Sequence, residues 1–276
     1  MSPTNIIAAK HLPDEPVAAR SDRPKNHLRL LSYNIQVAVA STRLRHYLTQ
    51  SWKHILPHQQ SLGNLNRIAD ITRNFDIVAL QEVDSGSLRS QFVNQVQYLA
   101  EKCEFPFWYY QTNRNLGKFA QACNGLLTHI KPTSIHEHKL PGLIPGRGVI
   151  EVRYGQNPHP IVILLAHLAL GKRARLMQIG FIAELANQFE HVVLMGDLNC
   201  QPHSQEIRTL VSNTNFVPPF EQEETFPSWR PSKKLDYILV TPELELKNVQ
   251  VLNHVVSDHL PVAVDIVLPK DVHLIG

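Results

Sequence analysis

Short apolar runs, each bounded by polar or turn-forming residues, recur along the chain and predict β-strands. Six such runs cover residues 28–33, 76–80, 161–166, 191–195, 235–240 and 261–267, and a seventh, Gly148–Tyr154, alternates more weakly. Because the runs are nearly continuous in apolar residues, we expect the strands to be covered on both faces. The pattern therefore predicts sheets that pack on each other or lie beneath helices.

Three stretches between the strands carry apolar residues at helical spacing. They cover residues 62–75, 92–103 and 174–189, and Ser90 is the expected N-cap of the second. Helices interleaved with strands form the outer layers of an α/β fold. No Pro- or Gly-rich linker divides the region, so the prediction is one domain over residues 28–270.

Two segments depart from this pattern. Residues 1–27 are rich in Pro, Asp, Lys and Arg and have no long apolar run, which predicts a disordered N-terminal tail. Residues 41–60 repeat apolar side chains at helical spacing. They predict a helical insertion that either lies beside the active rim and shapes substrate choice or packs on the sheet as a surface helix.

Composition and cysteine spacing narrow the class of protein. Hydrophobic residues make up 43% of the chain and charged residues 18%, and a net charge of +3 does not by itself indicate nucleic-acid binding. Cys103, Cys123 and Cys200 are widely separated without a CxxC spacing, so neither a zinc knot nor a disulfide framework is predicted. Without an export signal or a run of about 20 apolar residues, the expectation is a cytoplasmic protein with no transmembrane segment.

Polar residues stand at the margins of the apolar strands. In chain order, these margins hold Asn34, Glu82, His167, Asp197 with Asn199, Asp236, and Asp258 with His259. Ligand sites of α/β folds lie at strand ends, so we expect these side chains to converge on one rim. Taken singly, GDLN is also good turn chemistry, Asp258 can cap the next element and His167 can be a core histidine.

Carboxylate and amide oxygens dominate this set, and no cluster of Cys and His competes with them. Such hard donors favour Mg²⁺, with Mn²⁺ as the alternative. A hard cation among carboxylates suits phosphoryl oxygens, because it neutralises their charge and stabilises the charge that develops during in-line displacement. The rim therefore predicts metal-assisted chemistry on a phosphoester.

The ordered series LSYNIQ, LQEVD, LLAHL, MGDLN, KLDYILV and VSDHLP resembles the motifs of the endonuclease/exonuclease/phosphatase superfamily, which includes exonuclease III and DNase I. Any one motif is a weak signal, but all six occur in family order over nearly the whole chain. The resemblance implies a DNase I-like α/β fold, a four-layer α/β/β/α sandwich of two mixed β-sheets flanked by helices. It also implies a metal-dependent phosphoester hydrolase.

The resemblance implies roles for the residues that match the motifs. Glu82 resembles the principal Mg²⁺ ligand, with Asn34 beside it, and Asp258 is expected on the metal side or as an orienting group. Asp197 matches the aspartate that positions or deprotonates the attacking water. Asn199 matches the asparagine that holds a phosphate oxygen.

Two further motifs imply contacts with the scissile phosphate. Asp236 and His259 match an Asp–His pair, in which the carboxylate fixes the imidazole and favours its cation. His259 is then either a base or a cation that stabilises the pentacovalent phosphorane. His167 resembles a histidine that is expected to contact the phosphate.

Four residues are candidates for binding the rest of the substrate. Asn124, in CNGLL, resembles the substrate-binding asparagine of the family. Arg147 and Arg175 lie where the family tends to have arginines, although basic residues here can also form a solvated charged face. Trp229, on a Pro-bounded loop before Asp236, is the best candidate for stacking against substrate.

The substrate class is less sharply indicated. GDLNCQ lacks the arginine of the GDxNxR motif typical of inositol-polyphosphate 5-phosphatases. The prediction is a nuclease-type phosphodiesterase, endonuclease or exonuclease, with nucleic acid as its partner and no obligate protein partner. One alternative is a phosphodiesterase or phosphatase that acts on a phospholipid or small-molecule phosphoester, although no exposed apolar hairpin is evident. The other is a non-catalytic binding module, which would not need the full catalytic set.

Overall fold

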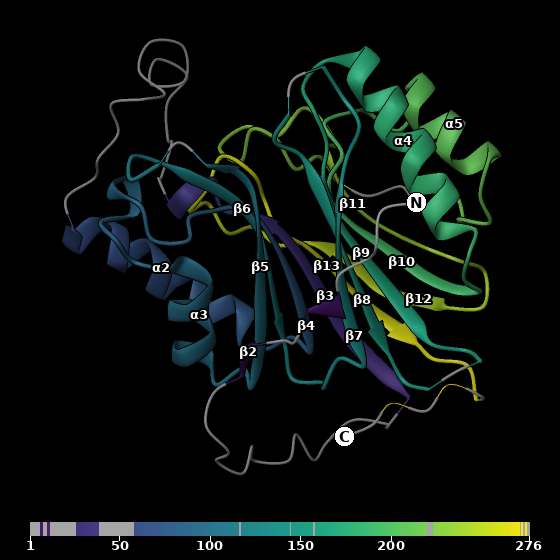
Figure 1. Cartoon of the computed structure of the whole chain (residues 1–276), viewed down its shortest axis with the longest axis horizontal. Coiled ribbons are helices and arrows are strands. Elements are labelled where there is room, and N and C mark those ends of the chain that lie inside the picture. Colours follow the sequence, from purple (N-terminus) through teal and green to yellow (C-terminus); the bar gives the residue numbers. More distant parts are fainter. Residues whose placement is uncertain are drawn as a thin grey trace.

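The computed structural model describes residues 6–7, 10–11, 26–38, 58–115, 117–143, 145–156, 158–219, 223–270, 272 and 274. Two β-sheets pack face to face, and helices cover their outer sides (Figure 1). Each sheet combines parallel and antiparallel neighbours. The predicted fold class, a four-layer sandwich of two mixed sheets flanked by helices, is therefore confirmed.

The seven-stranded sheet has the order β12-β13-β3-β4-β6-β5-β2, in which only β3 and β4 run parallel. Its strands are β2 (Lys10–His11), β3 (His27–Asn34), β4 (Ile77–Val83), β5 (Phe107–Asn115), β6 (Gln121–Thr128), β12 (Glu245–Val251) and β13 (Val262–Val267).

The six-stranded sheet has the order β1-β7-β8-β9-β10-β11, in which only β9 and β10 run parallel. Its strands are β1 (Ile6–Ile7), β7 (Ser134–Lys139), β8 (Gly148–Tyr154), β9 (Ile161–His167), β10 (His191–Asp197) and β11 (Asp236–Val240).

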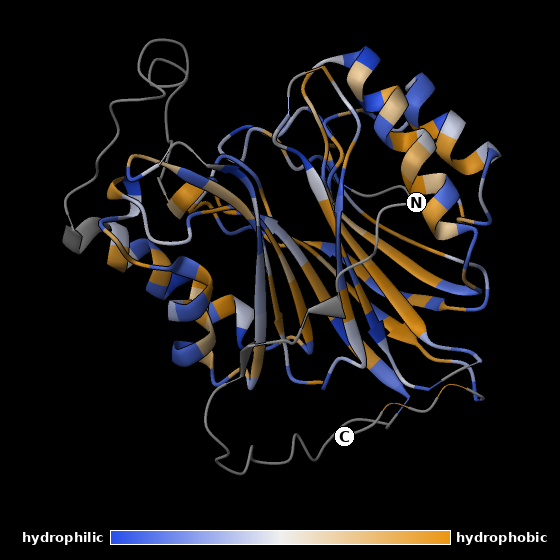
Figure 2. Ribbon diagram, viewed as in Figure 1, coloured by the Kyte–Doolittle hydropathy of each residue, from blue (hydrophilic) through white to orange (hydrophobic). Residues whose placement is uncertain are grey.

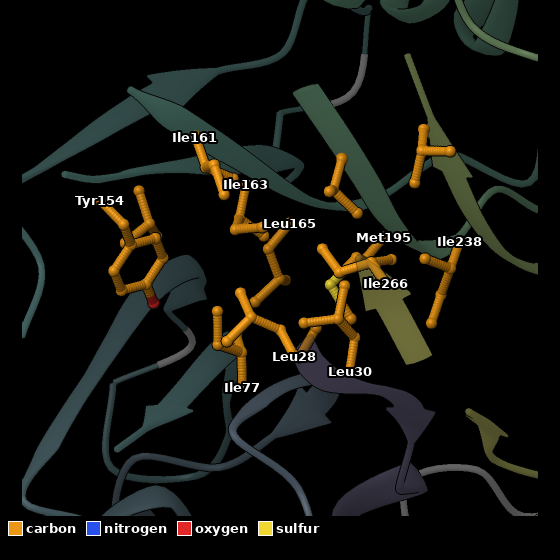
Figure 3. Packing of buried hydrophobic residues seen from close by; sticks show 14 of the residues in the cluster. Leu28, Leu30, Ile77, Tyr154, Ile161, Ile163, Leu165, Met195, Ile238 and Ile266 are labelled. Carbon is orange, nitrogen blue, oxygen red and sulfur yellow. The ribbon is translucent and has the colours of Figure 1, made fainter. Parts of the chain in front are cut away.

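Three apolar clusters fill the spaces between the four layers. The central cluster joins the sheets, with Leu30 and Ile77 of one sheet packed against Ile163 and Met195 of the other (Figure 3). The second lies between the seven-stranded sheet and α2 (His58–Thr72) and α3 (Gln95–Cys103), and the third lies between the six-stranded sheet and α4 (Lys172–Ala186) and α5 (Gln205–Ser212).

Burial on both faces explains the continuous apolar runs in the sequence. Every residue of β9 and of β10 is buried. These two strands are largely hydrophobic in Figure 2, whereas the outer helices alternate between hydrophobic and hydrophilic faces. No helix among the described residues is both long and apolar enough to cross a membrane.

The expected N-cap at Ser90 is wrong. Helix α3 begins at Gln95, and the side chain of Asn94 caps it by accepting a hydrogen bond from Gln97 N. Ser90 instead ends the short 3-10 helix η2 (Leu88–Ser90), and its hydroxyl donates to Asp84 Oδ1 over 2.9 Å. The Ser90 hydroxyl, which was expected to cap the helix, thus donates its hydrogen bond to the buried carboxylate of Asp84 instead.

Two predicted segments lie largely outside the described residues. Residues 41–57 of the expected helical insertion are not described, and residues 58–60 form the start of α2. Within the expected N-terminal tail, the short strands β1 and β2 extend the edges of the two sheets. The domain boundary at residues 28–270 stays a prediction.

Candidate active site

The polar margins of the strands meet at one edge of the sandwich. Asp197, the last residue of β10, pairs with His167 of β9 and with Asp236 of β11, so three functional groups lie side by side. Asn34 ends β3 of the other sheet, and its Nδ2 donates to Asp197 Oδ2 over 3.1 Å. Strand register, together with the packing of the two sheets, brings these residues together.

Asp236 and His259 form a buried pair. His259 Nδ1 lies 2.8 Å from Asp236 Oδ2, and the same oxygen accepts a 2.5 Å hydrogen bond from the Thr225 hydroxyl. The Phe226 ring packs on the imidazole with centroids 4.8 Å apart. Thr225 and Phe226, which the sequence analysis missed, therefore fix the two members of the pair. Their one signal was their place on the loop before Asp236.

The charge of His259 follows from its surroundings. Burial lowers the pKa of His259, but the carboxylates of Asp236 and Asp197 outweigh burial and raise the pKa to about 10. His259 Nε2 lies 3.8 Å from Asp197 Oδ2. At neutral pH the imidazole is therefore a cation between two carboxylates.

Asp197 is buried at the centre of the site. Its Oδ1 accepts a 2.9 Å hydrogen bond from Asn199 N, and its Oδ2 lies 3.4 Å from His167 Nε2. Burial raises the pKa of Asp197 to about 7, although the charge of His259 lowers it. The carboxyl group therefore changes charge near neutral pH, unlike an exposed aspartate with a pKa of about 3.9.

The GDLN turn has a backbone that few residues can adopt. Gly196 has a φ of +144°, and a Cβ there would stand 1.8 Å from Ala166 O. Asn199 has a φ of 51°, and its Nδ2 donates to Leu168 O over 3.0 Å. The glycine thus lets β10 lie close to β9 immediately before Asp197.

Glu82, Asn34 and Asp258 offer oxygen donors beside Asp197. Glu82 has a φ of 55° at an irregularity in β4, and its side chain is 39% exposed. Its Oε1 lies 3.4 Å from Asn34 Nδ2. The pKa of Asp258 is raised to about 6, because burial and the charge of Glu82, which raise it, outweigh the charge of His259, which lowers it.

The carboxylates of Glu82 and Asp258 fit a divalent cation. Asn34 presents its Nδ2 to Glu82 and Asp197, and its Oδ1 accepts a hydrogen bond from Gln36 N over 3.2 Å, so the amide would rotate to offer its oxygen to the cation. Carboxylates and an amide are hard oxygen donors, and Glu82 is open to solvent. Potential ligand atoms of Asp197, Asp236 and His259 also lie within 4.8 Å of one another. However, His259 Nδ1 is already paired with Asp236, and a cationic imidazole has no lone pair for a metal. Glu82, Asn34 and Asp258 therefore remain the candidate metal ligands.

A third group of potential ligands lies elsewhere. His159, Glu190 and His191 have ligand atoms within 4.8 Å of one another. They stand at the beginnings of β9 and β10, whereas His167 and Asp197 stand at the ends of these strands. The group of His159, Glu190 and His191 is therefore separated from the strand ends that carry His167 and Asp197 by the length of a strand, about 20 Å.

Arg147 fixes the tautomer of His167. Arg147 Nη1 lies 2.7 Å from His167 Nδ1, and because a guanidinium only donates, Nδ1 accepts and the ring proton is on Nε2, toward Asp197. Burial, together with the charge of Arg147, lowers the pKa of His167 well below its ordinary value. His167 is therefore a neutral hydrogen-bond donor.

Asn124 lies close to the same strand ends. Its Nδ2 donates to Gly148 O over 3.1 Å. Its Oδ1 is buried and has no hydrogen-bond partner among the described residues. A buried amide oxygen without a protein partner is a natural acceptor for a substrate group.

A cavity of about 660 Å³ opens beside these groups. Glu82, Asn124, Arg147 and His167 line it where it meets the strand ends. The remaining lining includes three more arginines and three large apolar side chains: Arg89, Arg114, Arg173, Leu143, Leu170 and Met177. Arg89 and Arg114 were not among the residues predicted from the sequence, because neither lies in a recognisable motif.

Arg175 and Trp229 do not line this cavity. Arg175 Nε donates to Glu206 Oε1 over 2.9 Å, and its Nη1 donates to Ala169 O over 3.3 Å. These contacts join α4 to α5 and hold the segment before α4. Trp229 is half-buried beside Ser228, whose backbone N donates to Asp258 O over 2.7 Å.

Comparisons with known proteins agree with this fold. An endonuclease/exonuclease/phosphatase from Bacteroides vulgatus has a TM-score of 0.67 at 16% identity, covering 89% of this chain and 100% of that chain. The mannosyl-6-phosphatase Bt3783 of Bacteroides thetaiotaomicron has a TM-score of 0.63 at 17% identity, and the match covers 87% of this chain and 100% of that chain. The human Nocturnin catalytic domain with bound sulfate has a TM-score of 0.63 at 18% identity, and the match covers 88% of this chain and 94% of that chain. At these identities the likeness shows the fold alone.

The sequence comparisons identify the family. No curated protein matches this chain. The model of the Endonuclease/Exonuclease/phosphatase family, however, matches residues 31–259, which include every polar strand margin described above. The chain therefore belongs to the endonuclease/exonuclease/phosphatase family and is a metal-dependent phosphoester hydrolase.

Proposed function

We propose that the chain is a Mg²⁺-dependent phosphodiesterase, with Mn²⁺ as the alternative cation. The observation that carries the proposal is the 2.8 Å contact of Asp236 with His259, which stands within 3.8 Å of Asp197. The fixed cationic imidazole of His259 can stabilise negative charge, and the buried carboxylate of Asp197 beside it can accept a proton. Both are needed when water attacks a phosphoester.

Glu82, Asn34 and Asp258 would hold the cation. When bound, Mg²⁺ neutralises phosphoryl oxygens and makes a coordinated water more acidic. Ser257 positions two of the three residues, because its hydroxyl lies 2.7 Å from Asn34 O and 3.2 Å from Asp258 Oδ1.

Asp197 orients the attacking water and accepts its proton. A pKa of about 7 matches this task, because a base with a pKa near the working pH is available and still accepts a proton well. Hydrogen bonds from Asn34 and Asn199 N hold the two carboxylate oxygens in place.

His259 acts as a cation that stabilises the phosphorane rather than as a base. Its pKa of about 10 keeps the proton on the imidazole at neutral pH, and Asp236 holds the ring in orientation. His167 and Asn199 would bind the phosphate oxygens, and Asn124 Oδ1 would accept a hydrogen bond from the adjoining group. Arg147 supports His167 through the 2.7 Å contact.

We expect a bell-shaped pH profile for kcat/KM. Activity should rise as the pH passes about 7, because Asp197 loses its proton and becomes a base. It should fall above pH about 10, because His259 then loses the proton that makes it a cation. A soluble chromogenic diester allows the measurement. Replacing exposed His203 with alanine should leave both limbs in place, and a profile that falls between pH about 7 and about 9 would contradict the assignment.

Two substrate classes fit the cavity. Nucleic acid, expected from the sequence, is supported by the four arginines that line the cavity, because guanidinium groups bind phosphates flanking the scissile bond. A lipid phosphoester is supported by the apolar side chains around the cavity mouth. The three cysteines are buried free thiols, which supports placement in the cytoplasm as part of this proposal.

A substrate panel with Mg²⁺ and with EDTA tests the proposal. The panel contains abasic, single-stranded and duplex DNA, RNA, a phospholipid and a soluble chromogenic diester. We expect cleavage of at least one diester with Mg²⁺, loss of this cleavage in EDTA, and recovery when Mg²⁺ is added in excess. Turnover that persists in EDTA would overturn the metal dependence. Cleavage of the phospholipid but of no nucleic acid would overturn the nuclease assignment.

A further inference from the structure

Large apolar side chains are exposed around the mouth of the cavity. The described residues include six large hydrophobic side chains with substantial exposure: Leu88, Phe92, Phe119, Leu143, Leu170 and Met177. Leu143 is 87% exposed, and Leu170 and Phe119 are each 73% exposed. Exposed apolar residues are ordinary when they are scattered. These six, here called the apolar rim, belong to four segments that each contribute residues to the lining of one cavity, namely the segment after β4, the β5–β6 hairpin, the β7–β8 connection and the segment that leads into the first turns of α4.

A shared cavity and two backbone contacts relate the segments of the apolar rim to one another. Leu143, Leu170 and Met177 line the cavity directly. Leu88 N donates to Lys118 O over 2.8 Å, and Arg89 N donates to Phe119 O over 3.2 Å. The loop after β4 and the β5–β6 connection are therefore joined. The sequence showed no exposed apolar hairpin, but the structure exposes Phe119 between β5 and β6.

A buried carboxylate holds part of this surface in place. Asp84 accepts hydrogen bonds from Gly86 N, from the Ser87 and Ser90 hydroxyls, and from Arg89 Nε. This network fixes the loop that carries Leu88 and Phe92. Their exposure is therefore a feature of an ordered loop with satisfied polar groups.

The charge of the surface is one-sided. The rim segments, residues 85–94, 113–121, 141–147 and 168–177, contain seven Lys or Arg and no Asp or Glu, although the whole chain has a net charge of only +3. Arg89 and Arg175 pair with Asp84 and Glu206, and Arg147 contacts His167, which leaves four exposed basic residues: Arg114, Lys118, Lys172 and Arg173. Such a surface suits an anionic partner that also offers apolar contact.

The apolar rim favours a lipid surface over nucleic acid. Single-stranded nucleic acid binds by stacking bases on aromatic rings, whereas four of the six rim residues are Leu or Met. Aliphatic side chains among Lys and Arg are typical of proteins that lie on anionic membranes, with apolar groups inserted and cations at the headgroups. We propose that the apolar rim docks this enzyme on an anionic phospholipid surface and presents a lipid phosphoester to the cavity. The choice of substrate rests on the proposed function, whereas the docking does not.

Vesicle sedimentation tests the docking separately from catalysis. The probes are phosphatidylcholine vesicles with and without phosphatidylglycerol, and the proteins are the full chain, Leu143→Glu, Leu170→Glu and Gln188→Glu. Gln188 is exposed just beyond the end of α4, so this control adds the same charge away from the rim. We expect the wild type to bind the anionic vesicles, less so at high salt. Each leucine variant should bind at least about tenfold more weakly, while Gln188→Glu binds as the wild type does.

Each outcome supports or overturns a separate claim. Asp197→Asn, which should be inactive, is expected to bind vesicles like the wild type. Mg²⁺-dependent cleavage of a soluble diester without vesicle binding would overturn the docking and leave the proposed function standing. Vesicle binding without Mg²⁺-dependent cleavage of any phosphoester would overturn the proposed function and leave the docking standing. Equal binding by wild type and Leu143→Glu, with equal thermal stability, would overturn the rim assignment. Loss of single-stranded oligonucleotide binding in the leucine variants, without vesicle binding, would make the rim a nucleic-acid surface.

Discussion

Replacing His259 with alanine is expected to lower kcat/KM for a phosphodiester by at least about a thousandfold. The variant loses the cation that is proposed to face the scissile phosphate, and the buried carboxylate of Asp236 loses the imidazole that pairs with its Oδ2. The same loss is expected for Asp197→Ala, which removes the group that orients the water. Both changes remove contributions made in the transition state, so kcat should fall more than KM rises.

The control for this experiment is another histidine. His203 is exposed two residues after GDLNCQ ends at Gln201, and His203→Ala should retain wild-type turnover. Circular dichroism and thermal unfolding would show that the variants are folded. Turnover by folded His259→Ala within a few-fold of the wild type would remove His259 from the catalytic site.

Replacing Gly196 with alanine is expected to destabilise the protein by about 4 kcal/mol or more. Two costs combine at this position. A φ of +144° is unfavourable for any residue with a Cβ, and that Cβ would stand 1.8 Å from Ala166 O in the neighbouring strand. Relief requires β9 and β10 to separate at the residues that carry His167 and Asp197, so the surviving folded protein should also lose activity. Urea unfolding measures the change in free energy.

Gly180 supplies the matched control for this substitution. It lies within α4, and a Cβ there would meet nothing within 4 Å. Gly180→Ala should therefore stabilise the protein by roughly 0.5–1 kcal/mol, because alanine has less conformational freedom to lose than glycine in a helix. If Gly196→Ala were as stable as Gly180→Ala, the close approach of β10 to β9 would be wrong.

Burial accounts for the strands that were predicted from the sequence. The central strands β3, β9 and β10 show as apolar runs because almost all of their residues are buried. The edge strand β12 has only exposed or half-buried residues, so ELKNVQV shows no apolar run. β7 reads SIHEHK and was missed for a similar reason. The central strand β6 was missed although six of its eight residues are buried, because the polar and small residues of QACNGLLT leave no continuous apolar run. An edge strand is defined by hydrogen bonds to its neighbour, which the pattern of side chains does not show.

The site residues were predictable where a strand end places them. Asp197, His167 and Asp236 each occupy the terminal position of a strand, and register alone aligns them. Thr225, Arg89 and Arg114 were not predictable, because contacts between segments far apart in sequence bring them to the site. Thr225 and Arg89 come from connections between strands, and Arg114 comes from the end of β5. Asp84 illustrates the difference. It lies in the LQEVD motif, yet its role in holding the next loop depends on donors that fold back onto it.

Binding of Mn²⁺, measured by electron paramagnetic resonance, tests the central claim most directly. The claim is that Glu82, with Asn34 and Asp258, holds the cation on which hydrolysis depends. The competing group of potential ligands, His159, Glu190 and His191, lies at the opposite ends of β9 and β10. The proteins to compare are the wild type, Glu82→Gln and Glu190→Gln.

We predict that Glu82→Gln binds Mn²⁺ at least about tenfold more weakly than the wild type and loses turnover. Glu190→Gln should match the wild type in both measurements. Retained Mn²⁺ binding and turnover in Glu82→Gln, with loss of both in Glu190→Gln, would contradict the account.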